Sequence, residues 1–267
     1  MPSRAVAELL AVVAPPACAA CREPLARADL RLCAGCTRAL PWLPARACPR
    51  CGLPSHRRAC PASAAAFARA WAPLAYDGVA RELVAALKFR AALPVATLMA
   101  AHIAANLPAD LSTGGPPPHA SRPAAPRASR PDAPGASRPD APRASGLPRP
   151  QGLVATALVP VPPQPARARR RGFDPAGALA AALAPRLGLP ERACLRRRDR
   201  EPRQVGATRA QRRRPGRLAI EVRHPPPARV LLVDDVHTTG ATLDACARAL
   251  VAAGCDEVVA LTYARTL

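Results

Sequence analysis

Residues 229–242 read RVLLVDDVHTTGAT, and this stretch decides the fold class of the chain. The apolar run at 230–233 is typical of a parallel strand that is covered on both faces. Apolar residues at helical spacing follow at 243–253, so the sequence predicts a strand, a loop and then a helix. This order is the building unit of α/β proteins with a mostly parallel sheet.

The loop of this unit carries groups that suit a sugar phosphate. Asp234 and Asp235 close the predicted strand, and their carboxylates can accept hydrogen bonds from vicinal sugar hydroxyls. Three hydroxyls and a glycine follow at 238–242, where backbone N–H groups and the helix dipole favour a phosphate. A sugar 5-phosphate satisfies both halves of the stretch. The alternative is a solvated Asp-Asp pair followed by a turn that binds no ligand.

Residues 233–242 resemble the phosphoribosyl pyrophosphate signature of type I phosphoribosyltransferases. Other segments narrow this resemblance to the ComF family of competence-associated phosphoribosyltransferase homologues: LVPVP at 158–162, RRRGFDPA at 169–176, the cysteine-rich start and ARTL at 264–267. The resemblance implies a type I phosphoribosyltransferase-like α/β fold, with a doubly wound, mostly parallel sheet and a small N-terminal zinc-ribbon module. It covers nearly the whole chain apart from one proline-rich insert.

The resemblance also implies which residues bind phosphoribosyl pyrophosphate with Mg²⁺. Asp234 and Asp235 are the catalytic candidates, which would bind the ribose hydroxyls and, indirectly, the metal. The 5-phosphate would be held by a loop that contains His237, Thr238, Thr239, Gly240, Ala241 and Thr242. The diphosphate would be held by a loop after a strand at 153–161, and this loop contains Pro162, Arg169, Arg171, Gly172 and Phe173.

Two more segments are expected to contribute to this site. The sequence predicts an amphipathic helix at 79–90 and a second helix at 93–106. The first ends in Lys88 and Arg90, which resemble a Lys-x-Arg element of the ComF family and would face the diphosphate from a hood. The alternative is that both cations only stabilise the helix end. A flexible loop at 196–217, which in phosphoribosyltransferases closes over the substrate, would supply Gln204, Arg209 and Arg212.

One segment departs from the family pattern. The family usually has Gly-Phe-Asn-Gln-Ala where this chain has Gly-Phe-Asp-Pro-Ala at 172–176. Asp174 as N-cap and Pro175 at the first helical position still favour a helix start. The substitution therefore leaves the predicted fold intact and removes the two side-chain amides from the site.

Seven of the ten cysteines fall in the first sixty residues, and six of these form CxxC pairs. Two CxxC turns can close a tetrahedral zinc site, and the first complete set is Cys18, Cys21, Cys33 and Cys36. The second set, Cys48, Cys51 and Cys60, lacks a fourth cysteine; either His56 substitutes or the site is vestigial. Disulfides are the alternative, which the lack of a convincing signal peptide disfavours. The zinc would be structural, because so short a segment has too small a core to fold without a bound metal or a cross-link.

Composition divides the chain into four parts. Residues 1–63 form the cysteine-rich module, 64–107 the helical hood and start of the phosphoribosyltransferase domain, and 153–267 its core. Between them, residues 108–152 contain twelve prolines and an Ala-Ser repeat with a period of eight residues. Such a segment cannot form a packed core and is expected to be a disordered insert.

The net charge of +21 is concentrated in one region, since residues 167–217 contain sixteen arginines and four acidic residues. This region is expected to bind anions, whether nucleic acid, pyrophosphate or another polyanion, although it can also be a solvated basic face. No run of about 18 apolar residues is present to span a membrane. The N-terminal apolar stretch is interrupted by Glu8 and is a poor signal peptide, so the cytoplasm is the expected compartment.

Two functional hypotheses follow. In the first, the protein is a ComF-like phosphoribosyltransferase that acts in natural competence and DNA uptake and transfers ribose 5-phosphate from phosphoribosyl pyrophosphate to an unknown nitrogen nucleophile. A nucleobase-salvage phosphoribosyltransferase is an alternative to it. In the second, it is a non-catalytic scaffold that binds single-stranded DNA and works with DNA-uptake proteins in natural competence.

Overall fold

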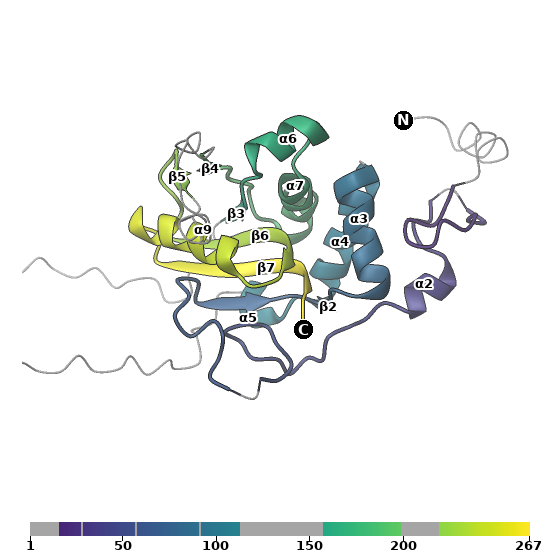
Figure 1. Cartoon of the computed structure of the whole chain (residues 1–267), viewed down its shortest axis with the longest axis horizontal. Helices are drawn as coiled ribbons and strands as arrows, with labels where there is room; N and C mark the ends of the chain where they lie inside the picture. Colours follow the sequence, from purple (N-terminus) through teal and green to yellow (C-terminus); the bar gives the residue numbers. More distant parts are fainter. Residues whose placement is uncertain (1–15, 28, 57, 91, 113–156, 199–218) are drawn as a thin grey trace, which may run out of the picture.

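A parallel sheet lies at the centre of the computed structural model, which describes residues 16–27, 29–56, 58–90, 92–112, 157–198 and 219–267 (Figure 1). The five-stranded sheet has the order β1 (Arg69–Trp71), β7 (Glu257–Arg265), β6 (Arg229–His237) and β3 (Ala157–Pro160), and β2 (Leu74–Ala75) also pairs with β7. Every pairing in this sheet is parallel. The prediction of an α/β fold with a mostly parallel sheet is therefore confirmed.

The strand β6 is longer than the sequence suggested. Its apolar part was predicted to end at residue 233, but pairing with β7 continues through Val236 and His237, which lie opposite Ala264 and Arg265. Asp234 and Asp235 lie in the last part of the strand, as predicted, and β6 continues for two residues beyond them. The pairing fixes the backbone on both sides of the two carboxylates.

Helices cover both faces of the sheet because successive β6 side chains point to opposite sides. Leu231 and Val233 pack with three helices: α3 (Gly78–Arg90), α4 (Leu93–Asn106) and α7 (Pro175–Leu187). Val230 and Leu232 pack instead with α9 (Ala241–Ala252) and with part of the N-terminal module. These bounds confirm the helices predicted at 79–90, 93–106 and 243–253 to within two residues.

The segment after β3 contains a helix where the sequence predicted a loop. Helix α6 (Pro165–Arg171) starts with a proline at its first turn and ends at Gly172, whose φ of 75° is the left-handed conformation of a helix C-cap. The N–H of Gly172 donates to the carbonyl of Ala168. Asp174 then caps α7 by accepting from the N–H of Ala176, and Pro175 takes the first helical position, as predicted.

The remaining elements are short. Helix α2 (Ala34–Arg38) belongs to the N-terminal module, and α5 (Ala109–Ser112) follows α4. Strands β4 (Leu195–Arg197) and β5 (Ile220–Val222) form a separate antiparallel pair. The predicted insert lies almost wholly outside the described residues, and so do the first residues of the strand predicted at 153–161. Within the described part of the chain, no helix is long and apolar enough to cross a membrane.

Candidate functional site

A cavity of about 280 Å³ lies at the carboxyl ends of β3 and β6. Its charged lining comes from elements that are far apart in the sequence. The carboxylates are Asp174, Asp234 and Asp235; the cations are Lys88, Arg167, Arg171 and Arg197; and the hydroxyls are Thr238 and Thr242. We call this the central cavity. Ligands of α/β proteins commonly bind at this edge of a parallel sheet, outside the carboxyl ends of the strands.

The acidic side of the central cavity is held by one close ion pair. Asp235 is only 5% exposed, and its Oδ1 lies 2.7 Å from Nζ of Lys88. The Oδ1 of Asp234 accepts from the backbone N–H of Asp235 at 2.8 Å. Burial, and then the negative charge of Asp235, raise the pKa of Asp234 to about 8. Burial also raises the pKa of Asp174. The three carboxylates therefore share a poorly solvated site.

The basic side is built on α6. Arg167 and Arg171 are four residues apart and so lie on one face of this helix, toward the cavity. The guanidinium carbon of Arg171 lies 5.2 Å from the centre of the Phe89 ring. Its Nε is buried and has no hydrogen-bond partner among the described residues. An unpaired buried donor of this kind is suited to an anionic ligand.

The loop after β6 divides between two cavities. Thr238 and Thr242 line the central cavity. A second cavity of about 200 Å³ lies between α9 and the N-terminal module, and His237, Thr239, Gly240 and Ala241 line it. We call this the ribbon-side cavity. Gly240 has a φ of 79°, and a Cβ on it would lie 2.7 Å from Nε2 of His237. Only glycine fits there without displacing the imidazole.

Four residues that were expected near the diphosphate do not line the central cavity: Arg90, Arg169, Gly172 and Phe173. Arg90 and Arg169 lie elsewhere because residues two positions apart in a helix point in different directions. Arg90 donates to the carbonyl of Ala19 and pairs with Glu82, whereas Lys88 lines the central cavity. Arg169 lines a different cleft from Arg167 and Arg171. Phe173 packs against the core.

Sequence analysis missed some lining residues and placed others beyond what the structure describes. The sequence predicted that residues 167–171 would hold the diphosphate, and Arg167 and Arg171 of this segment do line the central cavity, although the segment is a helix and not a loop. Sequence analysis treated Asp174 only as a helix cap. The predicted flexible-loop residues Gln204, Arg209 and Arg212 lie outside the described part of the chain.

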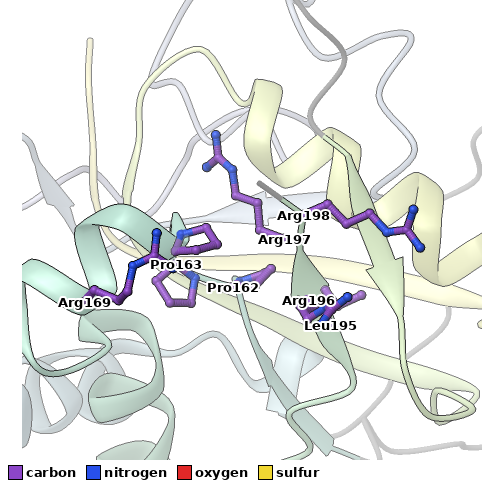
Figure 2. A pocket seen from close by; sticks show the side chains of 8 residues that line it. Pro162, Pro163, Arg169, Leu195, Arg196, Arg197 and Arg198 are labelled. Atoms are coloured by element: carbon purple, nitrogen blue, oxygen red, sulfur yellow. The ribbon is translucent and has the colours of Figure 1, made fainter. Parts of the chain in front are cut away.

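The neighbouring cleft has a volume of about 540 Å³ and is rich in arginine (Figure 2). Arg169 on α6 lies on one side, with Pro162 and Pro163 between it and the arginines of the other side. These are Arg196 and Arg197 on β4 and Arg198 directly after it. We call this the arginine cleft. Glu221 pairs with both Arg196 and Arg198 at 3.1 Å. Pro162, Pro163 and Arg197 line the central cavity as well, so the two sites are adjacent.

The N-terminal module contains two groups of converging metal ligands. In each group the ligand atoms all lie within 4.8 Å of one another: Cys18, Cys21, Cys33 and Cys36 in the first, and Cys48, Cys51, His56 and Cys60 in the second. The Sγ atoms of Cys21 and Cys33 are 3.8 Å apart, and those of Cys48 and Cys60 are 3.9 Å apart. Thiolates bound tetrahedrally to zinc at about 2.3 Å lie roughly 3.8 Å apart, so both groups fit this metal.

His56 completes the second group, for which the sequence left two alternatives. Its Nδ1 lies 2.9 Å from the carbonyl of Arg58, which can accept the Nδ1–H and leave Nε2 to bind the metal. Burial alone would raise the pKa of Cys48, but His56 and nearby backbone amides lower it to about 6. These contacts favour the thiolate that zinc requires.

Residues 9–66 match the family model of the double zinc ribbon domain. This match agrees with the two ligand groups and supports structural Zn²⁺ in both. Searches of curated proteins and of solved structures found no match for the chain.

The double zinc ribbon contacts the sheet and helix α9. The N–H of Ala70 in β1 donates to the carbonyl of Pro49, and the N–H of Ala66 donates to Oδ1 of Asp244 in α9. Arg50 donates to five carbonyls between residues 62 and 68 and so organises the segment that leads into β1. The second ribbon therefore forms one wall of the ribbon-side cavity.

Proposed function

We propose that this chain is a ComF-like phosphoribosyltransferase-domain protein that binds phosphoribosyl pyrophosphate with Mg²⁺ in the central cavity. The observation that carries the proposal is the meeting of three groups in one cavity. These are the Asp234–Asp235 pair, the hydroxyls of the loop before α9, and the cations of α3 and α6. A sugar that carries a phosphate at one end and a diphosphate at the other needs all three.

Each part of the ligand has a matching group. The 5-phosphate would lie against Thr238 and Thr242 at the N-terminus of α9, where backbone N–H groups and the helix dipole favour an anion. The ribose hydroxyls would donate to Asp234 and Asp235. The diphosphate would be bound by Arg167 and by Arg171, whose buried Nε lacks a partner in the described structure.

The ion pair between Lys88 and Asp235 would open when the ligand binds. Lys88 neutralises a buried carboxylate that would otherwise face two more carboxylates across a small cavity. When the diphosphate binds, Lys88 can move from Asp235 to a phosphate oxygen. Asp235 then becomes free to accept from a ribose hydroxyl.

Transfer from such a ligand would break the bond between C1 of the ribose and a diphosphate oxygen, and form a bond from C1 to a nitrogen nucleophile that loses its proton. Asp234 and Asp235 would hold Mg²⁺ indirectly, and the bound ion would supply neutralisation of charge on the leaving group. The arginines of α6 would stabilise the departing diphosphate electrostatically. The acceptor is a nitrogen nucleophile, which a nucleobase of a salvage reaction would provide.

Calorimetric titration of the full-length, zinc-quantified protein with phosphoribosyl pyrophosphate and Mg²⁺ tests this proposal. We expect binding by the wild type and at least a tenfold loss in Asp234→Asn/Asp235→Asn, about the effect of one charge-assisted hydrogen bond. Asp256→Asn is the matched control, because Asp256 is exposed and lies outside the cavity. Failure of the wild type to bind would refute the proposal.

A second candidate function is the binding of single-stranded DNA in a DNA-uptake process, and the arginine cleft favours it. Four arginines around about 540 Å³, next to the central cavity, are suited to successive phosphates of a polyanion. The described lining of the cleft contains no aromatic side chain for stacking with bases. We therefore expect contact with the phosphate backbone and little dependence on base sequence.

A further inference from the structure

Arg265 near the end of β7 connects the second zinc ribbon with the loop after β6. It is 6% exposed, and its Nε donates to the carbonyl of Cys51 at 3.1 Å. Its Nη1 donates to the carbonyls of His237 and Thr266, each at 2.8 Å, and to the carbonyl of Thr238. One buried guanidinium thus contacts both a metal-ligand residue and the first residues of the phosphate-binding loop that the proposed function requires.

We infer that Arg265 is a positioning residue, which orients the loop at 238–242 for anion binding by tying it to the metal-binding turn of the second ribbon. This inference rests on the proposed function, since it assigns Arg265 to the same site. Arg265 lines the ribbon-side cavity and not the central cavity. Its effect on a ligand would therefore be exerted through the backbone of the loop.

The geometry of the peptide unit explains how Arg265 would orient the loop at 238–242. In a trans peptide the C=O and the next N–H point in opposite directions. Because Arg265 holds the carbonyls of His237 and Thr238 on the ribbon side, the N–H groups of Thr238 and Thr239 are directed away from that side. This is the orientation that amides need if they are to bind a phosphate in the central cavity.

The position of Arg265 depends in turn on the closed metal-binding turn. The carbonyl of Cys51 belongs to a turn in which the N–H of Gly52 donates to Cys48 and the N–H of Cys48 donates to Leu53, both at 2.8 Å. Among the ion pairs of the described residues none includes Arg265, which is 6% exposed. A zinc site with three thiolates and a neutral imidazole carries one net negative charge, which would stabilise this buried cation.

Arg265→Lys tests the inference in the full-length, zinc-loaded protein, because lysine keeps the charge but cannot reach several carbonyls at once. Arg248→Lys is the matched control. Arg248 lines the same cavity, and among the described residues its side chain donates to Asp244 of α9 and to the carbonyl of Ala64 in the ribbon segment, not to the carbonyls of the loop. Titration with phosphoribosyl pyrophosphate and Mg²⁺, and separately with inorganic phosphate, gives the affinity. Hydrogen exchange of residues 238–242 and the zinc content are measured on the same samples.

We expect Arg265→Lys to retain two zinc ions, to weaken both ligands by about tenfold, and to increase exchange in the loop. Arg248→Lys should match the wild type in all three measurements. Unchanged loop exchange in Arg265→Lys would overturn the inference. If the wild type binds neither ligand, the proposed function fails, but the exchange comparison still decides whether Arg265 orders the loop.

If Arg265→Lys does not fold, His56→Ala tests the inference independently, because it removes a ligand of the second zinc. His56 is exposed and lies outside the linings of both cavities. We expect the same increase in exchange at 238–242, because the Cys51 carbonyl would lose its fixed position. Loop exchange equal to that of the wild type would contradict the link between the ribbon and the loop.

Discussion

Single residues in the central cavity show how buried charge is arranged. Lys88 neutralises Asp235, while Asp234 has no cation in direct contact among the ion pairs of the described residues. Its pKa is raised by burial first and by Asp235 second. In the ligand-free protein, Asp234 thus holds its proton to a higher pH than an exposed aspartate.

This raised pKa predicts a pH dependence of stability. The folded-state pKa lies above the unfolded value, so the contribution of Asp234 to stability is present at low pH and is lost as the pH rises toward about 8. Asp234→Asn has no ionisable group at this position, so it lacks this pH-dependent contribution to stability. We expect its stability relative to the wild type to increase between about pH 5 and 8, by at most about 1.4 kcal/mol per pH unit. Thermal unfolding at a series of pH values measures the difference, and a constant difference would contradict the prediction.

Gly240 gives a second prediction at the residue scale. Gly240→Ala places a methyl group 2.7 Å from Nε2 of His237, and the residue must keep its φ of 79°. We expect a loss of about 2 to 4 kcal/mol from left-handed strain and overpacking together. Gly188→Ala is the control, since it has a φ of 64° and nothing within 4 Å of the added Cβ. Denaturant unfolding of both variants separates the clash from the strain, and equal losses would argue against the contact with His237.

At the scale of elements, the zinc ribbons are short segments that gain their order from metal ligands. The first ribbon has four cysteines, and the second has three cysteines and His56. Each is also joined to an element of the domain by an arginine: Arg90 of α3 donates to the carbonyl of Ala19, and Arg265 of β7 to that of Cys51. The ribbons are therefore packed against the elements that form the candidate site.

Zinc content tests the second ribbon. We expect two zinc ions per chain in the wild type, and one in His56→Ala at chelator concentrations that leave the wild type loaded, because three thiolates alone bind zinc less tightly. His224→Ala is the matched control, because His224 is exposed and belongs to neither ligand group. Elemental analysis after dialysis measures the ratio. Two retained zinc ions in His56→Ala would show that His56 is not a ligand.

At the scale of the whole molecule, the excess of positive charge gathers where binding is proposed. The chain has a net charge of +21, and arginines line both the central cavity and the arginine cleft beside it. The two sites share Arg197, Pro162 and Pro163. A polyanion in the cleft and a diphosphate in the cavity would therefore interact through common residues.

Single-stranded DNA binding should depend steeply on salt if the cleft contacts phosphates. Arg196→Gln/Arg198→Gln removes two cleft cations, so we expect the slope of log affinity against log salt to become shallower by about 1 to 1.5. Arg38→Gln/Arg46→Gln is the control for net charge, because both residues are exposed and lie outside the cleft. Fluorescence anisotropy with a short oligonucleotide at several salt concentrations gives the slopes. Equal slopes for the two variants would indicate binding by general charge alone.

The sequence by itself determined the features that depend on near neighbours. Apolar periodicity predicted α3, α4 and α9, CxxC spacing predicted the first zinc site, and Asp174-Pro175 predicted the start of α7. These features follow from the hydrogen bonds, side-chain spacing and caps of a few consecutive residues. The sequence also predicted four residues that line the central cavity, because they adjoin one strand and one helix: Asp234, Asp235, Thr238 and Thr242.

Only the tertiary structure decided which distant residues meet. It places Lys88 against Asp235, makes His56 the fourth ligand of the second ribbon, and directs Arg265 toward Cys51 and the loop after β6. It also places Lys88 and Arg171 at the central cavity, and Arg90 and Arg169 outside its lining. Residues two positions apart in a helix point in different directions, so the placement of the helix in the fold decides which of them faces the site. The direction of a helix face depends on the elements it packs against, and local sequence does not contain that information.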